Sequence, residues 1–454
     1  MNSALIAISI VFCAGYIAIA TEHVIKIDKT ATALLTGVIC WTLYILNADT
    51  LLSLTQIPDW FRAEHVGNPP HEIMLSWISH FQLVNVIGEI SSILFFLLGA
   101  MTIVELVDAH GGFDLITRRI QSRNTAVLLT IVSIFAFFLS AILDNLTTTI
   151  VMISLIRKLI ADQQDRWFFA GIIVIAANAG GAWSPIGDVT TTMLWIGGQI
   201  STANIVKSVF LPSLACLAIP LIYLVFKLRG KTIDAVTPEA QDKNVVLEML
   251  SPAKRNILFT VGMVALLFVP VFKTVTHLPP VMGMMLSLAI VWIVSEILHE
   301  DKDQALDSGL HIIQVLKRID SPSVLFFLGI LLAVSALEAT GLLASIAGAL
   351  NNTVGNVNVI VFLIGLLSAV VDNVPLVAAT MGMYDLNAHP MDSAMWEYLA
   401  FAAGTGGSCL VIGSAAGVAA MGMEKISFGW YARNIGGLAL AGYVGGSILY
   451  FALQ

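Results

Sequence analysis

Two Asp-Asn pairs stand inside long apolar stretches of the sequence. Asp144 and Asn145 occur in SAILDNLTTT, and Asp372 and Asn373 occur in SAVVDNVPLV, at an offset of 228 residues. A charged side chain at membrane depth costs about 2.5–3.5 kcal/mol even on insertion scales, so such an acid indicates a functional site. Carboxylate and amide oxygens bind hard cations, and a carboxylate can hold a proton instead. The pairs therefore predict a site where a proton and Na⁺ or Li⁺ compete.

A third acid lies at a break rich in glycine and proline. The segment AANAGGAWSPIGDVTTT places Asn178, Asp188 and Thr190 around two adjacent glycines and Pro185. Glycine frees the backbone and proline lacks an N–H donor, so a helix should unwind here and offer carbonyl groups to a cation. The predicted cation ligands are Asp144, Asn145, Asp188, Asp372, Asn373, Asn178, Thr147 and Thr190.

Each of these residues also has a structural interpretation. Asp and Asn are favoured helix N-caps, and threonine often bonds the backbone of its own helix. A neutral Ser or Asn would cap a helix in lipid at lower cost, which favours function for the acids. Glu89, Glu105 and Glu338 lie on or beside flanking spans, and Glu89 and Glu105 are close enough to span ends to be solvated.

The composition predicts a helical membrane protein that spans the bilayer many times. The chain is 57% hydrophobic and 11% charged, whereas a soluble domain carries about 25% charged residues. Continuous apolar stretches of about 20 residues favour helices over a barrel. The N-terminal segment has no basic region, so we expect residues 3–20 to be a span and not a cleaved signal peptide.

Several function classes lack their signatures in this sequence. There is no Walker A loop, dinucleotide fingerprint, Cys/His zinc cluster or basic run suited to nucleic acid, and the four cysteines lie in apolar stretches. No nucleophile–base arrangement is evident. We therefore expect a transporter driven by ion gradients, not an enzyme, with no cofactor besides the transported ions. A simple channel is disfavoured because broken elements occur in pairs.

The apolar pattern predicts ten full spans and two interrupted segments. With the N-terminus outside, 19 of the 22 basic residues fall in loops predicted to lie inside, as the positive-inside rule requires. A single crossing at either interrupted segment would reverse everything after it, so we expect re-entrant hairpins there. The spans are 3–20, 31–54, 84–107, 167–200, 203–227, 255–274, 279–299, 322–340, 396–424 and 430–452, and the hairpins are 125–160 and 356–386.

The two halves of the chain are similar in sequence. AANAGGAWSPIGD matches AAGTGGSCLVIGS at an offset of 226, which aligns Asp188 with Ser414. Each half holds five predicted spans and one hairpin, and an odd number of crossings inverts the second half. The expected organisation is two inverted-topology repeats, 1–227 and 255–454, with a cytoplasmic linker 228–254. Each repeat would contain a hairpin and a helix broken near the midplane of the membrane.

The pattern SAILDNLTTTIVMISLIRK, followed by ANAGGAWSPIGDVTTT, resembles the NhaD-type sodium/proton antiporters of the ion-transporter superfamily, over essentially the whole chain. Carboxylate-transporting members of that superfamily carry Ser-Asn-Thr at the hairpin tips. Here Asp144 and Asp372 stand at the Ser position, while Leu146 and Val374 stand at the Thr position. This departure favours the NhaD branch.

The resemblance implies exchange of Na⁺ or Li⁺ for H⁺ by alternating access, with Asp144, Asp188 and Asp372 as the important acids. It also implies a scaffold and a transport domain in each protomer, a homodimer, and a bacterial cytoplasmic (inner) membrane. The alternative is a Na⁺-coupled anion transporter for a dicarboxylate, citrate or arsenite. The absence of Arg and Lys at the hairpin tips and helix breaks, together with three acids there, argues against an anionic substrate.

Overall fold

The structure is a computed structural model that describes residues 3–113, 122, 124–233, 251–298, 312–410 and 413–454. Within these ranges it is helical, with no β-strand and a single isolated bridge between Asn124 and Thr232. Eight of the described helices are long and apolar enough to cross a membrane, or nine when one bent pair counts as a single span. The predicted all-helical membrane protein is confirmed. Most of the predicted linker 228–254 lies outside the described residues.

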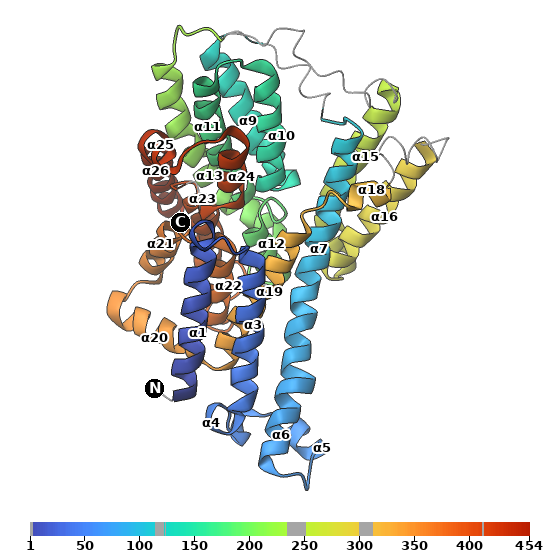
Figure 1. The fold of residues 1–454 in the computed structure, drawn as a ribbon, viewed down its shortest axis with the longest axis vertical. Helices are drawn as coiled ribbons and strands as arrows, with labels where there is room; N and C mark the ends of the chain where they lie inside the picture. Colours follow the sequence, from blue (N-terminus) through green and yellow to red (C-terminus); the bar gives the residue numbers. More distant parts are fainter. Residues whose placement is uncertain (1–2, 114–121, 123, 234–250, 299–311, 411–412) are drawn as a thin grey trace. The chain divides into compact units, whose positions relative to one another are not determined.

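The chain divides into two compact units. Most of their helices are labelled in Figure 1. The first unit comprises Met1–Phe95, Asp320–Asn356 and Ala378–Ala388. The second unit comprises the remaining three segments, which are Phe96–Ile319, Val357–Val377 and His389–Gln454. Each unit is thus assembled from both halves of the sequence. The division into the repeats 1–227 and 255–454 stays a prediction.

In the first unit, helix α3 (Lys29–Leu46) packs closely against α19 (Ser321–Ala339). A Cβ atom on Gly37 would lie 2.6 Å from the carbonyl oxygen of Gly329, so the missing side chains let the two backbones approach. Small residues commonly serve this purpose between membrane helices. The unit also contains α1 (Ser3–Ala20), α2 (Glu22–Ile25), α4 (Ala48–Leu51), η1 (Leu54–Gln56), α5 (Asp59–Glu64), α6 (Pro70–Ser76), the π-helix η2 (Trp77–Gln82) and α20 (Leu342–Val354), and α7 (Leu83–Ala109) begins in it.

The core of the second unit is formed by the first arms of the two helices that were predicted to break. Every residue of α11 (Gln163–Ala182) from Phe169 onward is buried, and so is every residue of α23 (Ala394–Gly406) from Met395 onward. The other helices are α9 (Thr125–Leu143), α10 (Asn145–Leu159), α12 (Val189–Ile196), α13 (Thr202–Lys227), α15 (Pro252–Thr276), α16 (Pro280–Leu298), α18 (Ile312–Leu316), α21 (Val357–Leu367), α24 (Ala415–Glu424), α25 (Phe428–Tyr431), the π-helix η5 (Ala432–Gly436) and α26 (Gly437–Leu453). Helix α22 (Asn373–Met383) begins in this unit and ends in the first one.

Several predicted boundaries differ from the structure. The span predicted at 84–107 belongs to one helical run of 40 residues, Pro70–Ala109, so much of the segment 55–83 is helix and not loop. The span predicted at 31–54 ends at Leu46 because Asn47 leaves the helical backbone. Helix α20 was not predicted, since its 13 residues are too few to cross a membrane.

The interrupted segments do form helix pairs. In the segment 125–160, α9 and α10 meet at Asp144 and lie side by side, and α21 and α22 flank the turn before Asn373. Helix α9 has 19 residues and by length could cross a membrane alone, so it is longer than the short hairpin arm that we expected. Re-entry of these pairs into the membrane stays a prediction.

Candidate functional site

The backbone at Asp144 adopts a conformation that is nearly restricted to glycine. Asp144 ends α9 and precedes α10 with φ 102° and ψ 161°. A non-glycine residue in this region costs roughly 1–3 kcal/mol, and such residues cluster at functional sites. Glycine would be the ordinary choice for this turn. A side chain with a carboxylate is therefore kept here against the local backbone preference.

The Asp144 carboxylate binds the first turn of α10. Its Oδ1 accepts a hydrogen bond from the Thr147 backbone N–H at 2.7 Å, and its Oδ2 accepts one from Thr147 Oγ1 at 2.9 Å. The side chain is half-buried. Asp144 is thus the N-cap of α10, as its structural interpretation requires, and it brings the Thr147 hydroxyl against a carboxylate.

Asp188 repeats this arrangement at the N-terminus of α12. Its Oδ1 accepts hydrogen bonds from the backbone N–H and from Oγ1 of Thr190, both at 2.9 Å. Its Oδ2 accepts from Asn145 Nδ2 at 2.7 Å, and the residue is 2% exposed. Asn145 is the first residue of α10, so its amide joins the α9–α10 turn to the break between α11 and α12.

Asn178 connects this pair to the second broken helix. Its Oδ1 accepts from Asn145 Nδ2 at 3.0 Å, and its Nδ2 donates to Ser408 Oγ at 2.9 Å and to Ser414 Oγ at 3.0 Å. Ser408 and Ser414 were not among the predicted ligands. The alignment of Ser414 with Asp188 was the sequence signal that could have identified it.

Among the described residues, the Asp144 and Asp188 carboxylates have no basic hydrogen-bond partner. Asp144 and Asp372 both act electrostatically on Asp188. In the part of the chain that the structure describes, the hydrogen-bond donors to the Asp144 and Asp188 carboxylates are neutral N–H and O–H groups. Burial of an unpaired charge is unfavourable, so a proton or a bound cation stabilises these carboxylates.

The second hairpin is connected differently. Asp372 Oδ1 accepts from the Val374 backbone N–H at 3.1 Å, which resembles the capping at Asp144. Asn373 is 5% exposed, and its Nδ2 has no hydrogen-bond partner among the described residues. The amide of Asn145 donates to Asn178 and Asp188, and these two positions align with a glycine and a serine in the second half. Asp372 therefore acts electrostatically on Asp188, whereas Asn373 Nδ2 makes no hydrogen bond to this network among the described residues.

The backbone around the two breaks is built alike. A Cβ on Gly180 would lie 2.1 Å from Phe137 O, and a Cβ on Gly406 would lie 1.9 Å from Gly365 O. Ser140 Oγ donates to the Ala177 carbonyl at 2.6 Å, and Ser368 Oγ donates to the Ala403 carbonyl at 3.1 Å. These pairs of contacts are offset by 226 to 228 residues in the sequence. An inverted orientation of the two halves stays a prediction.

The three flanking acids are Glu89, Glu105 and Glu338. Glu105 Oε1 lies 3.7 Å from Arg318 Nη1 in a partly exposed ion pair, as a solvated structural role would require. Glu89 and Glu338 belong to the first unit and interact electrostatically with each other. Among the described residues, no three His, Cys, Asp or Glu side chains gather as a metal site. The candidate ligands of an alkali ion are carboxylate, amide and hydroxyl oxygens together.

Comparison with known proteins identifies the family. The family described as “Citrate transporter” matches residues 16–406. “Sodium/proton antiporter 1” of Arabidopsis thaliana is 48% identical over 99% of this chain and 72% of its own length, and “Sodium/proton antiporter 2” of the same plant is 43% identical over 98% and 99%. “Na(+)/H(+) antiporter NhaD” of Vibrio cholerae is 33% identical over 81% of this chain and 79% of its own length. The chain therefore belongs to the citrate transporter family of integral membrane proteins and, within it, to the NhaD-type sodium/proton antiporters.

Proposed function

We propose that this protein exchanges Na⁺, or Li⁺, for H⁺ across a membrane by alternating access. Asp144 and Asp188 are the groups that carry either a proton or the cation, and Asp372 completes the site. Asn145, Asn178, Asn373, Thr147 and Thr190 supply or orient further oxygen ligands. The relatives named as sodium/proton antiporters support the exchanged ions.

One observation carries this proposal. The Asp144 and Asp188 carboxylates receive hydrogen bonds from neutral donors, and within the described residues neither forms an ion pair with Lys or Arg. A carboxylate that already paired with Arg would have little reason to exchange a proton for a metal ion. Two acids without such a partner can be neutralised in turn by H⁺ and by Na⁺, and this competition couples the two fluxes.

The neutral donors include hydroxyl groups that could themselves become ligands of a cation. Each carboxylate receives a threonine hydroxyl, from Thr147 at Asp144 and from Thr190 at Asp188. A hydroxyl has two acceptor lone pairs and can turn its proton away, so it can change from donor to cation ligand without moving its oxygen. Na⁺ binding therefore requires rotation of O–H groups and little movement of the chain.

The test is Na⁺-driven proton flux in liposomes that contain the purified protein and a pH-sensitive dye. We expect a gradient of Na⁺ or Li⁺ to drive protons across the liposome membrane, and a gradient of K⁺ to drive a much smaller proton flux. Asp144→Asn keeps an N-cap residue for α10 and should abolish the flux. Folded Asp144→Asn protein with wild-type exchange would overturn the assignment, and so would Na⁺ flux in the wild type without proton movement.

A second candidate function follows from the description of the matching family. “Citrate transporter” names an anion carrier, and such a protein could use Na⁺ as its coupling ion. Three acids at the site would repel a di- or tricarboxylate, which is why we rank this function second. Uptake of labelled citrate, succinate or arsenite by the same liposomes distinguishes the two functions, because the exchanger transports none of them.

Further parts of the proposal concern assembly and location. We propose a homodimer in which each protomer has a scaffold and a transport domain, and mass measurement of the protein in detergent or in nanodiscs tests the dimer. We propose a bacterial inner membrane as the location. Because two similar proteins are from a plant, a plant membrane is the alternative, and localisation of a tagged chain decides between them.

A further inference from the structure

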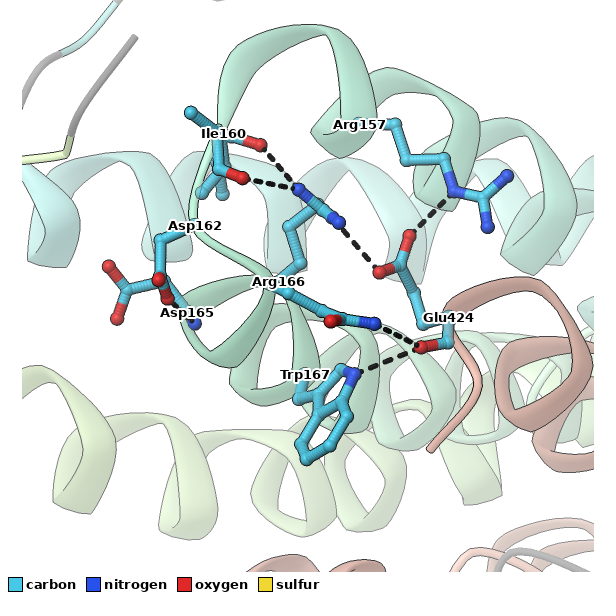
Figure 2. A network of polar contacts seen from close by, with 9 residues as sticks. Arg157, Ile160, Asp162, Asp165, Arg166, Trp167 and Glu424 are labelled. Carbon is cyan, nitrogen blue, oxygen red and sulfur yellow. Dashed lines mark hydrogen bonds and ion pairs between the residues drawn. The ribbon is translucent and has the colours of Figure 1, made fainter. Parts of the chain in front are cut away.

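An ion cluster around a buried glutamate joins three helices of the second unit (Figure 2). Glu424 is 2% exposed, and its Oε1 accepts from Arg157 Nε at 2.6 Å while its Oε2 accepts from Arg166 Nε at 2.9 Å. Arg166 Nη1 also donates to the carbonyl oxygens of Ile160 and Ala161, at 3.0 and 2.7 Å. We call Arg157, Arg166 and Glu424 the Arg–Glu–Arg cluster. It connects the last turn of α24 to α10 and to the start of α11.

The backbone carbonyl of Glu424 is also hydrogen-bonded to α11. Its carbonyl oxygen accepts from Trp167 Nε1 at 3.0 Å and from Gln163 Nε2 at 3.3 Å, both on the first turns of α11 (Figure 2). These bonds satisfy one of the carbonyl groups that a helix leaves without a partner at its C-terminus. The end of α24 is therefore fixed by contacts to α11 through two independent kinds of bond.

A carboxylate is an unfavourable residue at this position for the helix itself. The C-terminus of a helix carries partial negative charge, which favours Lys or Arg and disfavours Glu. Burial adds a desolvation cost that only good geometry with partner charges offsets. The stability of α24 alone does not explain Glu424, whereas a requirement to hold α24 against two particular helices does.

Each of the three helices holds or adjoins a residue of the candidate site, at a distance from the cluster along the helix. Helix α10 begins directly after Asp144, α11 carries Asn178, and α24 begins directly after its N-cap Ser414. The ten residues of α24 span about 15 Å, so the cluster and the site are about one short helix apart. A helix of this length transmits a shift at one end to the other end as a rigid body.

We propose that the Arg–Glu–Arg cluster positions the candidate site by fixing α24 against α10 and α11, so that Ser414 stays within hydrogen-bond distance of Asn178. Arg157, Arg166 and Glu424 are positioning residues and touch no ion. The transport part of the test rests on the proposed function, and the geometric part does not.

The geometric test measures the position of α24 directly. Asn178→Cys and Ser414→Cys are introduced together after replacement of the four native cysteines, and a small oxidant, molecular iodine, cross-links the two buried thiols as a disulfide in the folded protein. We expect Glu424→Gln to lower the cross-linking rate several-fold. The control is Arg62→Gln, which removes an exposed Arg–carboxylate pair with Asp59 in the first unit and should leave the rate unchanged.

The transport test uses the same substitutions without the cysteines. We expect Glu424→Gln to raise the KM for Na⁺ roughly tenfold and to change the maximal rate much less, because small displacements of ligands act on binding geometry. Arg166→Gln should act in the same direction. The double variant Glu424→Gln with Arg166→Gln should be no worse than Glu424→Gln alone, since the pair acts as a unit.

The outcomes separate the two proposals. Folded Glu424→Gln protein with wild-type cross-linking and wild-type KM overturns the positioning role. If the wild type shows no Na⁺-driven proton flux, the proposed function fails, and the cross-linking comparison still decides the positioning role. If Glu424→Gln yields no folded protein, Arg157→Gln and Arg166→Gln decide, because each removes one of the two arginine bonds to the Glu424 carboxylate and leaves the other. A wild-type cross-linking rate in both of them overturns the proposal.

Discussion

The break before α12 and the break before α24 have the same backbone and different chemistry. Asp188 has φ −147° and ψ 148°, Ser414 has φ −146° and ψ 149°, and each side chain caps the helix that follows. The neighbouring asparagines differ. Asn145 donates a hydrogen bond to Asp188, whereas Nδ2 of Asn373, which is the counterpart of Asn145 in the second half, has no partner among the described residues. The backbone conformation is thus repeated in the two halves, whereas two of the three acids, Asp144 and Asp188, lie in the first half. Removal of the charge should therefore be possible without loss of the fold.

The largest expected effect comes from making the two breaks chemically alike. Asp188→Ser places the residue of the second break in the first one, and serine is as good an N-cap as aspartate. We expect Na⁺-driven proton flux to fall to the level of protein-free liposomes while the protein remains folded. Asp320→Ser, the same substitution at the N-cap of α19, should leave the flux near the wild-type rate. Retained exchange in Asp188→Ser would show that the charge difference has no role.

The next effect tests the shared backbone. Gly180→Ala and Gly406→Ala would each drive a methyl group into a carbonyl oxygen, of Phe137 and Gly365 respectively. We expect each to destabilise the protein by about 1–3 kcal/mol, as overpacking does. Gly422→Ala meets nothing within 4 Å and is the control. Thermal unfolding of the purified variants measures the effect, and a clear difference between the two halves would contradict a common framework.

A smaller and asymmetric effect is expected at the two asparagines. Asn145→Ala leaves Asp188 Oδ2 and Asn178 Oδ1 without their donor, so the KM for Na⁺ should rise about tenfold, the cost of a charge-assisted hydrogen bond. Asn373→Ala removes an amide whose nitrogen has no partner among the described residues, so only its oxygen can contribute to Na⁺ binding, and the KM should rise less than in Asn145→Ala. Equal effects at both positions would contradict the asymmetry. Transport kinetics in liposomes compare the two variants.

The positions of the helix breaks at Asp144 and before Asp188 could be predicted from the sequence because they have local signals. Asp144 and Asp188 follow apolar runs directly, and glycine and proline interrupt the helix before Asp188. The side-chain partners had no such signal. Asn178 and Ser414 are 236 residues apart, and Arg157 and Glu424 are 267 residues apart. Pattern alone cannot pair residues at such distances, except where the repeat offset aligns them.

Two further features were not predicted. They are the strained backbone at Asp144 and the helical residues Pro70–Gln82 that precede α7. An aspartate with φ 102° has no sequence signal, since glycine is the residue that normally indicates such a turn. The segment 55–83, which lies between two predicted spans, was expected to be an outer loop. Pro70 instead opens a helix at its first position, where the missing N–H costs nothing.

The most direct test of the central claim is the KM for Na⁺ measured as a function of pH in the reconstituted wild-type protein. If H⁺ and Na⁺ compete for the same carboxylates, the KM must rise as the pH falls, approaching tenfold per pH unit where protons occupy the site. The maximal rate at saturating Na⁺ should change much less. A KM that stays constant across the range in which the flux itself varies would contradict a shared site.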